Sequence, residues 1–267
     1  MTRQDPALNA LDWFNRRALV AAGFSEQTVE SPAGPQTVFT AGQGTPILLL
    51  HGAGDHAGSW SHAAPPLLAA GRYHVVIPDL AGRGTSAPYE GPLDTPTILQ
   101  GLDAIIAPLA APAILVGNSH GAWLALLYTK AQPERVDRIV AVNGAPIETL
   151  PPGITLTPST RDEARRLWQA MLDPSRWAIP DFVLDELIRK GREGAIARLT
   201  IPPLCSLSEI RRPIDLLWGE SDQLLPLSLA RALGARLTTI PHCGHLPHIE
   251  CAAQFNAAIA RLLEAQP

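Results

Sequence analysis

Several features that define other classes of protein are scarce in this chain of 267 residues. Only three cysteines are present, Cys205, Cys243 and Cys251, and none forms a Cys-X-X-Cys pair, which excludes a disulfide scaffold and a zinc ribbon. We therefore expect all three to be small buried side chains in a reducing compartment. Charged residues make up only 17% and the net charge is −4, which argues against a disordered chain and against a nucleic-acid-binding surface.

Long hydrophobic runs are also lacking. Acidic and basic residues interrupt the N-terminal segment, so it does not resemble a signal peptide. The longest apolar stretch, residues 105–117, contains Pro108 and Pro112 and is shorter than the roughly 18 residues that a membrane span needs. We expect a soluble, cytoplasmic protein, monomeric or homodimeric, that has neither a nucleic acid nor a membrane as its partner.

The chain does contain many short apolar segments that are separated by turn residues. Hydrophobic residues make up 46%, and 26 prolines and 21 glycines punctuate the sequence. Residues 47–50 and 114–116 are apolar without alternation, which is typical of parallel strands that are covered on both faces. Segments with helical spacing lie between such runs, which predicts the α/β class. The expected strands are residues 37–40, 46–50, 73–77, 113–117, 138–143, 214–218 and 236–240, and the expected helices after the N-terminal one are residues 59–70, 95–107, 121–132, 228–233 and 249–264.

The alternation of strand and helix stops after Ala145. Residues 161–198 contain eight Lys or Arg and seven Asp or Glu with helical apolar spacing, and prolines flank this segment. We interpret residues 146–210 as a small helical cap that is inserted into a core of residues 25–145 and 211–267. Its inward face is expected to consist of Leu167, Met171, Phe182, Leu187 and Ile188. Residues 1–24 are expected to add an N-terminal helix with an apolar stripe that packs on the core, formed by Leu8, Leu11, Phe14, Ala18, Leu19 and Ala22.

A candidate nucleophile follows the expected strand 113–117. Residues 117–121 read Gly-Asn-Ser-His-Gly and open the next helix. A serine on such a strand-turn-helix corner is lifted clear of the sheet, and the flanking glycines avoid clashes in the turn. This pattern indicates Ser119 as a nucleophile, although the motif alone also fits a serine that caps the helix.

Two further residues complete a candidate catalytic triad. A serine hydroxyl needs a general base, and the base needs an acid that orients it. Asp222 lies just past the expected strand 214–218, and His245 lies just past the expected strand 236–240. All three candidates therefore fall at the carboxyl ends of strands, where open α/β sheets bind ligands, in the chain order Ser, Asp, His.

Residues 51–54, His-Gly-Ala-Gly, come directly after the expected strand 46–50. A glycine-flanked turn at this place can direct the backbone N–H of Ala53 at a developing oxyanion, and the N–H of His120 is the expected second donor. A simple turn is the alternative interpretation.

The remaining histidines have less specific interpretations. The spacing of His242, His245 and His248 is compatible with a metal-binding tract, but no carboxylate or cysteine pair of standard spacing accompanies it. We therefore assign His245 as the base and expect His51 and His248 to be hydrogen-bonded structural residues. His56 and His62 are expected at the surface or at the rim of a pocket, and Asp79 is expected to fasten the loop after its strand.

Together these motifs resemble the α/β-hydrolase superfamily from about residue 28 to residue 264. The matching segments are residues 51–54, 78–86 (Pro-Asp-Leu-Ala-Gly-Arg-Gly-Thr-Ser), 117–121, 218–226 (Trp-Gly-Glu-Ser-Asp-Gln-Leu-Leu-Pro) and 244–250 (Gly-His-Leu-Pro-His-Ile-Glu). The resemblance implies an eight-stranded, mostly parallel sheet with helices on both faces and a helical cap after the sixth strand. Within the superfamily, residues 51–60 and Asn118 resemble the meta-cleavage-product C–C hydrolases and related esterases.

Three positions depart from the pattern of those C–C hydrolases. Leu246 stands where that group usually has an aromatic residue, and His120 and Ala122 replace the more usual Met and Gly beside the nucleophile. Arg189 lies near the place of the cap arginine that binds the substrate carboxylate in that group.

The sequence therefore favours a serine hydrolase of small or medium carboxylic esters, with no metal, nucleotide or flavin implied. Two alternatives stay open. The same triad could hydrolyse a C–C bond next to a ketone, or the fold could serve a non-hydrolytic protein that binds a small ligand.

Overall fold

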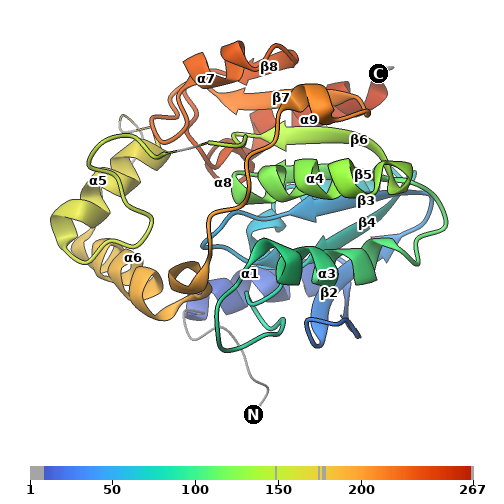
Figure 1. The fold of residues 1–267 in the computed structure, drawn as a ribbon, viewed down its shortest axis with the longest axis horizontal. Coiled ribbons are helices and arrows are strands. Elements are labelled where there is room, and N and C mark those ends of the chain that lie inside the picture. The colour runs from blue at the N-terminus through green and yellow to red at the C-terminus, as the bar shows by residue number, and fades with distance from the viewer. Residues whose placement is uncertain (1–8, 148, 174, 176–178, 266–267) are drawn as a thin grey trace.

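An eight-stranded sheet lies at the centre of the structure (Figure 1). The computed structural model describes residues 9–147, 149–173, 175 and 179–265. The strand order is β1-β2-β4-β3-β5-β6-β7-β8; β2 is antiparallel to β1 and β4, and all other neighbours are parallel. The strands are β1 (Ser25–Val29), β2 (Gln36–Gly42), β3 (Thr45–Leu50), β4 (Tyr73–Pro78), β5 (Ala113–Asn118), β6 (Val136–Val142), β7 (Ile214–Gly219) and β8 (Arg236–Ile240). The predicted mostly parallel sheet is confirmed; β1 was not among the strands expected from the sequence.

Helices cover both faces of the sheet because alternate strand residues point to opposite cores. Leu48 and Leu50 of β3 pack with α3, α4 and α7, whereas Ile47 and Leu49 pack with α1, α2 and α9. The helices of these two layers are α1 (Ala10–Ala21), α2 (Ala64–Ala69), α3 (Thr95–Ile106), α4 (His120–Ala131), α7 (Leu227–Ala232) and α9 (Ala252–Glu264). The expected helix 249–264 is divided at Cys251 into the short α8 (Pro247–Glu250) and α9.

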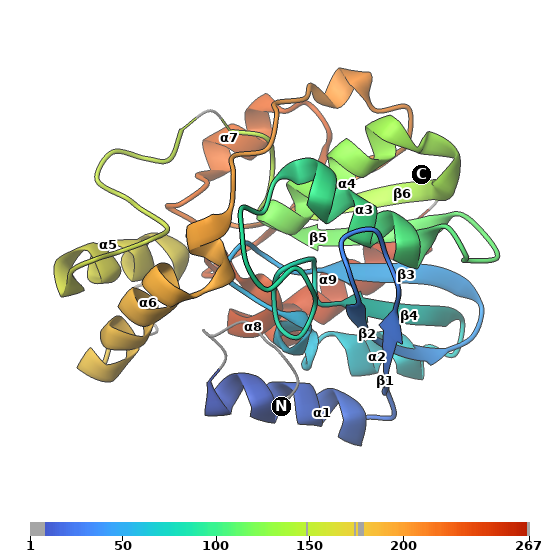
Figure 2. The same cartoon turned by 60° about the horizontal axis from the view of Figure 1, so that its bottom comes forward.

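The N-terminal helix α1 lies along the lower edge of the molecule in Figure 2 and is oriented differently from the prediction. Leu19 is buried, as expected for the apolar stripe, but Leu11 and Phe14 are 64% and 70% exposed. Leu8 lies outside the described residues. The expected packing of the stripe on the core is therefore wrong for Leu11 and Phe14.

Two buried charged side chains determine which face of α1 turns inward. Arg16 donates a hydrogen bond of 2.5 Å to Asp79 in the loop after β4, and this guanidinium holds the pKa of Asp79 below its usual range although burial acts in the opposite direction. Asp12 contacts His56 Nε2 at 3.0 Å and Lys190 Nζ at 2.9 Å. Because a buried charge must be paired, these contacts outweigh the burial of two apolar side chains. His56, expected near the surface, is buried by the same contacts.

The helices of the segment between β6 and β7 lie beside the sheet at the left of Figure 1, and we refer to this segment, residues 143–213, as the cap. Its described helices are α5 (Arg161–Met171) and α6 (Asp181–Glu193), followed by the short 3₁₀ turns η3 (Ala195–Arg198) and η4 (Leu207–Glu209). Leu167 is buried as expected, but Phe182 is 72% exposed. Leu184 is the buried leucine of α6, and because two residues along a helix are about 200° apart, Phe182 points to the opposite side.

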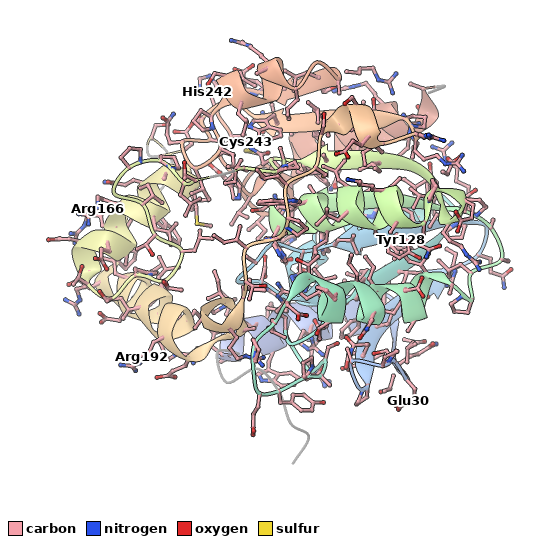
Figure 3. All side chains as sticks on the ribbon, in the orientation of Figure 1. Glu30, Tyr128, Arg166, Arg192, His242 and Cys243 are labelled. Atoms are coloured by element: carbon pink, nitrogen blue, oxygen red, sulfur yellow. A yellow bond between two sulfur atoms is a disulfide. The ribbon has the colours of Figure 1, made fainter. Side chains whose placement is uncertain are left out.

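The cysteines do not follow the prediction of three unpaired thiols. Cys243, labelled in Figure 3, forms a disulfide bond with Cys251 across the turn between β8 and α9, whereas Cys205 is free. The two cysteines can pair because the chain reverses its direction between β8 and α9. No local sequence pattern indicated this reversal. None of the helices in the described ranges is long and apolar enough to cross a membrane.

Candidate active site

Ser119 lies in a tight corner between β5 and α4. Its backbone has a φ of 52°, which is unusual for a residue other than glycine, and its N–H donates to Val142 O at 2.9 Å. A Cβ atom on Gly121 would overlap the carbonyl oxygen of Leu50, and a Cβ atom on Gly117 would lie 2.5 Å from Ala122 N. The two glycines therefore allow α4 to start directly against the sheet, so that Ser119 stands at the carboxyl end of β5.

Asp222 and His245 are brought together from the ends of β7 and β8. The distance from His245 Nδ1 to Asp222 Oδ2 is 2.8 Å, and both side chains are buried. Asn143 Nδ2 donates to the same carboxylate oxygen at 2.7 Å, while the backbone N–H groups of Leu224 and Leu225 donate to Oδ1 at 2.9 and 2.8 Å. Four hydrogen bonds thus fix the carboxylate, and its orientation in turn fixes the imidazole.

The backbone of His245 is held from two sides. Its N–H donates to Met171 O in the cap at 2.5 Å, and its carbonyl oxygen accepts a bond of 3.0 Å from Asn118 Nδ2. Because Nδ1 faces a carboxylate, which can only accept when ionised, the ring proton is assigned to Nδ1. Nε2 has no hydrogen-bond partner among the described residues and is the ring atom left with a lone pair for a proton.

Ala53, His120 and Ser119 all line one cavity, which is described below. His120 is the first residue of α4, and the first N–H groups of a helix have no acceptor inside the helix. Burial and then the nearby charge of Arg83 lower the pKa of the His120 imidazole well below its usual value, so this side chain is neutral. The structure therefore places both expected oxyanion residues on the wall of the cavity that Ser119 also lines.

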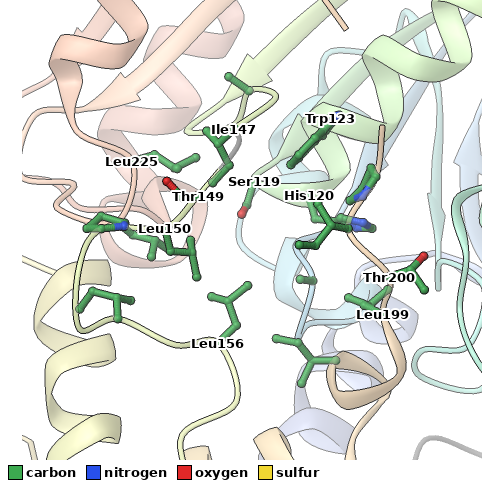
Figure 4. A pocket seen from close by; sticks show the side chains of 18 of the residues that line it. Ser119, His120, Trp123, Ile147, Thr149, Leu150, Leu156, Leu199, Thr200 and Leu225 are labelled. Atoms are coloured by element: carbon green, nitrogen blue, oxygen red, sulfur yellow. The ribbon is translucent and has the colours of Figure 1, made fainter. Parts of the chain in front are cut away.

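The cavity lies between the sheet and the cap and has a volume of about 610 Å³. Figure 4 shows Ser119 at its centre, with Ile147 and Leu225 on one side and His120 and Leu199 on the other. The walls are mostly apolar, and within the described parts of the chain no Asp, Glu, Lys or Arg lines them.

Two other histidines near the site are structural, as expected. His51 Nε2 accepts from Leu80 N at 3.0 Å, and its Nδ1 donates to Gly52 O at 2.8 Å. His248 stacks on Trp60 with 4.2 Å between ring centroids, but contrary to expectation its nitrogens have no hydrogen-bond partner in the described structure. Burial is the main cause that lowers the pKa of each imidazole to about 3.

The sequence matches a family model described as the alpha/beta hydrolase family over residues 47–258. The chain belongs to the alpha/beta hydrolase family. This match spans every candidate residue of the site, from Ala53 to His245. Family membership confirms the resemblance seen in the motifs and the predicted fold.

Individual members of the alpha/beta hydrolase family resemble this chain over most of their length. A 2-hydroxy-6-oxo-6-phenylhexa-2,4-dienoate hydrolase from Burkholderia cepacia is 30% identical and aligns with 81% of this chain and 86% of its own. The structure of carboxylesterase CesB from Bacillus subtilis covers 96% of this chain and 99% of its own, with a TM-score of 0.75 and 18% identity. That of a meta-cleavage product hydrolase from Pseudomonas fluorescens covers 89% and 97%, with a TM-score of 0.71 and 21% identity.

Proposed function

We propose that this protein is a serine hydrolase that cleaves carboxylic esters of small or medium size through an acyl-enzyme. The observation that supports this most is the hydrogen bond of 2.8 Å between Asp222 and His245, which follow β7 and β8 at the same edge of the sheet as Ser119, a residue that lines the cavity. The acid and base come from two different strands and the serine from a third, so this arrangement is not a by-product of local structure.

In the proposed mechanism Ser119 Oγ attacks the carbonyl carbon of the ester while His245 Nε2 takes the hydroxyl proton. Asp222 stabilises the imidazolium that forms, and the backbone N–H groups of Ala53 and His120 bind the tetrahedral oxyanion. Collapse of this intermediate expels the alcohol, which receives the proton from His245. A water molecule, activated by the same base, then releases the acid from Ser119. These steps use only groups of the protein and water.

The walls of the cavity favour an uncharged substrate. The relative from Burkholderia cepacia acts on a dienoate, whose name denotes a carboxylate. Arg189, which the sequence places near the expected position of a carboxylate-binding arginine, bonds to Glu186 at 2.6 Å in α6 and does not appear among the described residues that line the cavity. Because transferring a carboxylate into an apolar cavity without a paired cation is costly, a neutral ester is the better fit.

The test compares wild-type protein with the Ser119→Ala and His245→Ala variants on p-nitrophenyl esters of graded acyl length and on a vinylogous 1,5-diketone. We expect turnover of short and medium esters by the wild type and a loss of about a thousandfold or more in each variant. The double variant should be little worse than either single one, because both residues serve the same proton transfer. Turnover of the diketone far above that of any ester would favour the C–C hydrolase alternative.

Three further outcomes would contradict the proposal. A folded Ser119→Ala protein with full activity would show that the nucleophile lies elsewhere. A wild-type protein that binds small ligands in the cavity but turns over neither substrate class would favour the non-hydrolytic alternative. Interfacial activation on emulsified triglyceride, with little action on dissolved esters, would contradict the preference for small and medium substrates.

A further inference from the structure

Arg83 is a fully buried arginine in the loop between β4 and α3. Its Nε donates to Ala53 O at 3.4 Å, and its Nη2 lies 3.3 Å from Nδ1 of the His120 ring. Its Nη1 donates to Ala81 O in its own loop at 3.2 Å. One guanidinium therefore contacts both residues whose N–H groups form the proposed oxyanion hole.

Ala53 and His120 come from different parts of the fold. Ala53 follows β3, whereas His120 begins α4, and a bridge between them has to come from a third segment. An oxyanion hole works only if its two donors are held at the right separation before the charge develops. The planar, forked guanidinium of Arg83 is suited to this task because its N–H groups point in fixed directions.

The neutral state of the His120 ring allows it to accept a hydrogen bond in this bridge. Since burial and the charge of Arg83 lower the pKa of the imidazole well below its usual value, the neutral ring can accept a hydrogen bond from Arg83 Nη2 at Nδ1. The guanidinium does not lose its proton in proteins. Donor and acceptor thus keep their roles throughout the reaction.

We propose that Arg83 is the positioning residue of the oxyanion hole, which holds Ala53 and His120 at the separation that the tetrahedral intermediate requires. This inference rests on the proposed function of Ser119 as a nucleophile. It predicts that the loss of Arg83 weakens binding of the transition state more than binding of the substrate, because the geometry of the donors matters most once the oxyanion has formed.

The test is the Arg83→Met variant, with kcat and KM measured on a short p-nitrophenyl ester and the inhibition constant measured for phenylboronic acid, which forms a tetrahedral anion with an active serine. We expect kcat to fall and the boronate constant to rise by about tenfold or more, while KM changes by less than about threefold. Arg198→Met is the matched control, because Arg198 also bonds to backbone carbonyls of this loop, those of Gly82, Pro88 and Gly91. It should change kcat and the boronate constant by less than about twofold.

A folded Arg83→Met protein with wild-type kcat and boronate affinity would overturn the proposal, as would an equal loss in Arg198→Met. If Arg83→Met does not fold, Arg83→Lys carries the test, because it keeps the buried charge but replaces the two donor nitrogens that contact Ala53 and His120 by a single nitrogen. A loss of about threefold or more in boronate affinity is then expected, and wild-type affinity would refute the bridge. A wild-type protein that neither hydrolyses esters nor binds the boronate would instead refute the proposed function itself.

Discussion

Replacing His248 by phenylalanine should make the protein more resistant to acid. The imidazole is 0% exposed, stacks on Trp60 and lies 6.1 Å from the ring of Phe255, measured between centroids. Neither ring nitrogen has a hydrogen-bond partner among the described residues, and burial lowers the pKa to about 3. In the unfolded chain the same group titrates near its ordinary pKa of about 6.5.

The sign of the effect follows from this difference. Between the two pKa values the unfolded chain binds a proton that the folded protein excludes, so stability is fully present above pH 6.5 and is lost as the pH falls. Between pH 7.5 and pH 5 this histidine alone should lower the free energy of unfolding by about 2 kcal/mol. In His248→Phe that contribution disappears, and the ring stacking is kept.

The assay is urea denaturation of the wild type and His248→Phe at pH 7.5 and pH 5. The variant should gain about 2 kcal/mol relative to the wild type when the pH is lowered, whatever its relative stability at pH 7.5. His62→Phe is the control, because His62 is exposed and its replacement should leave the pH dependence unchanged. A stability difference between His248→Phe and wild type that is the same at both pH values would refute the reasoning.

Two further predictions concern the site itself. Asp222→Asn should lower kcat by about a thousandfold or more without unfolding the protein, because an amide has one acceptor oxygen and cannot serve both His245 Nδ1 and the backbone N–H groups of Leu224 and Leu225. With its NH2 group toward His245 it favours the wrong imidazole tautomer; ester turnover within tenfold of wild type would contradict the role of the acid. Gly121→Ala should cost about 1–3 kcal/mol in urea denaturation and also lower ester turnover, because its Cβ would push α4 away from the carbonyl of Leu50. Unchanged stability of that variant would show that the corner has more room than the structure indicates.

The parts of this protein that depend on short-range order could be predicted from the amino-acid sequence. Apolar runs without alternation identified β3 and β5 as strands buried on both faces, because that pattern needs no knowledge of the partner strand. The glycines around Ser119 identified the corner, and the ends of two later strands identified Asp222 and His245. These positions could be found because in a parallel sheet the carboxyl ends of the strands all lie at the same edge.

The contacts between side chains of different elements could be read only from the folded structure. The sequence placed an apolar stripe of α1 on the core, but the buried partners of Asp12 and Arg16 turned Leu11 and Phe14 outward. The pairing of Cys243 with Cys251 and the contacts of Arg83 likewise depend on segments that only folding brings together. Periodicity describes how residues are arranged along one element, whereas the partner of a buried charge lies on another element. The electrostatic cost of leaving a buried charge unpaired can exceed the cost of exposing several apolar side chains.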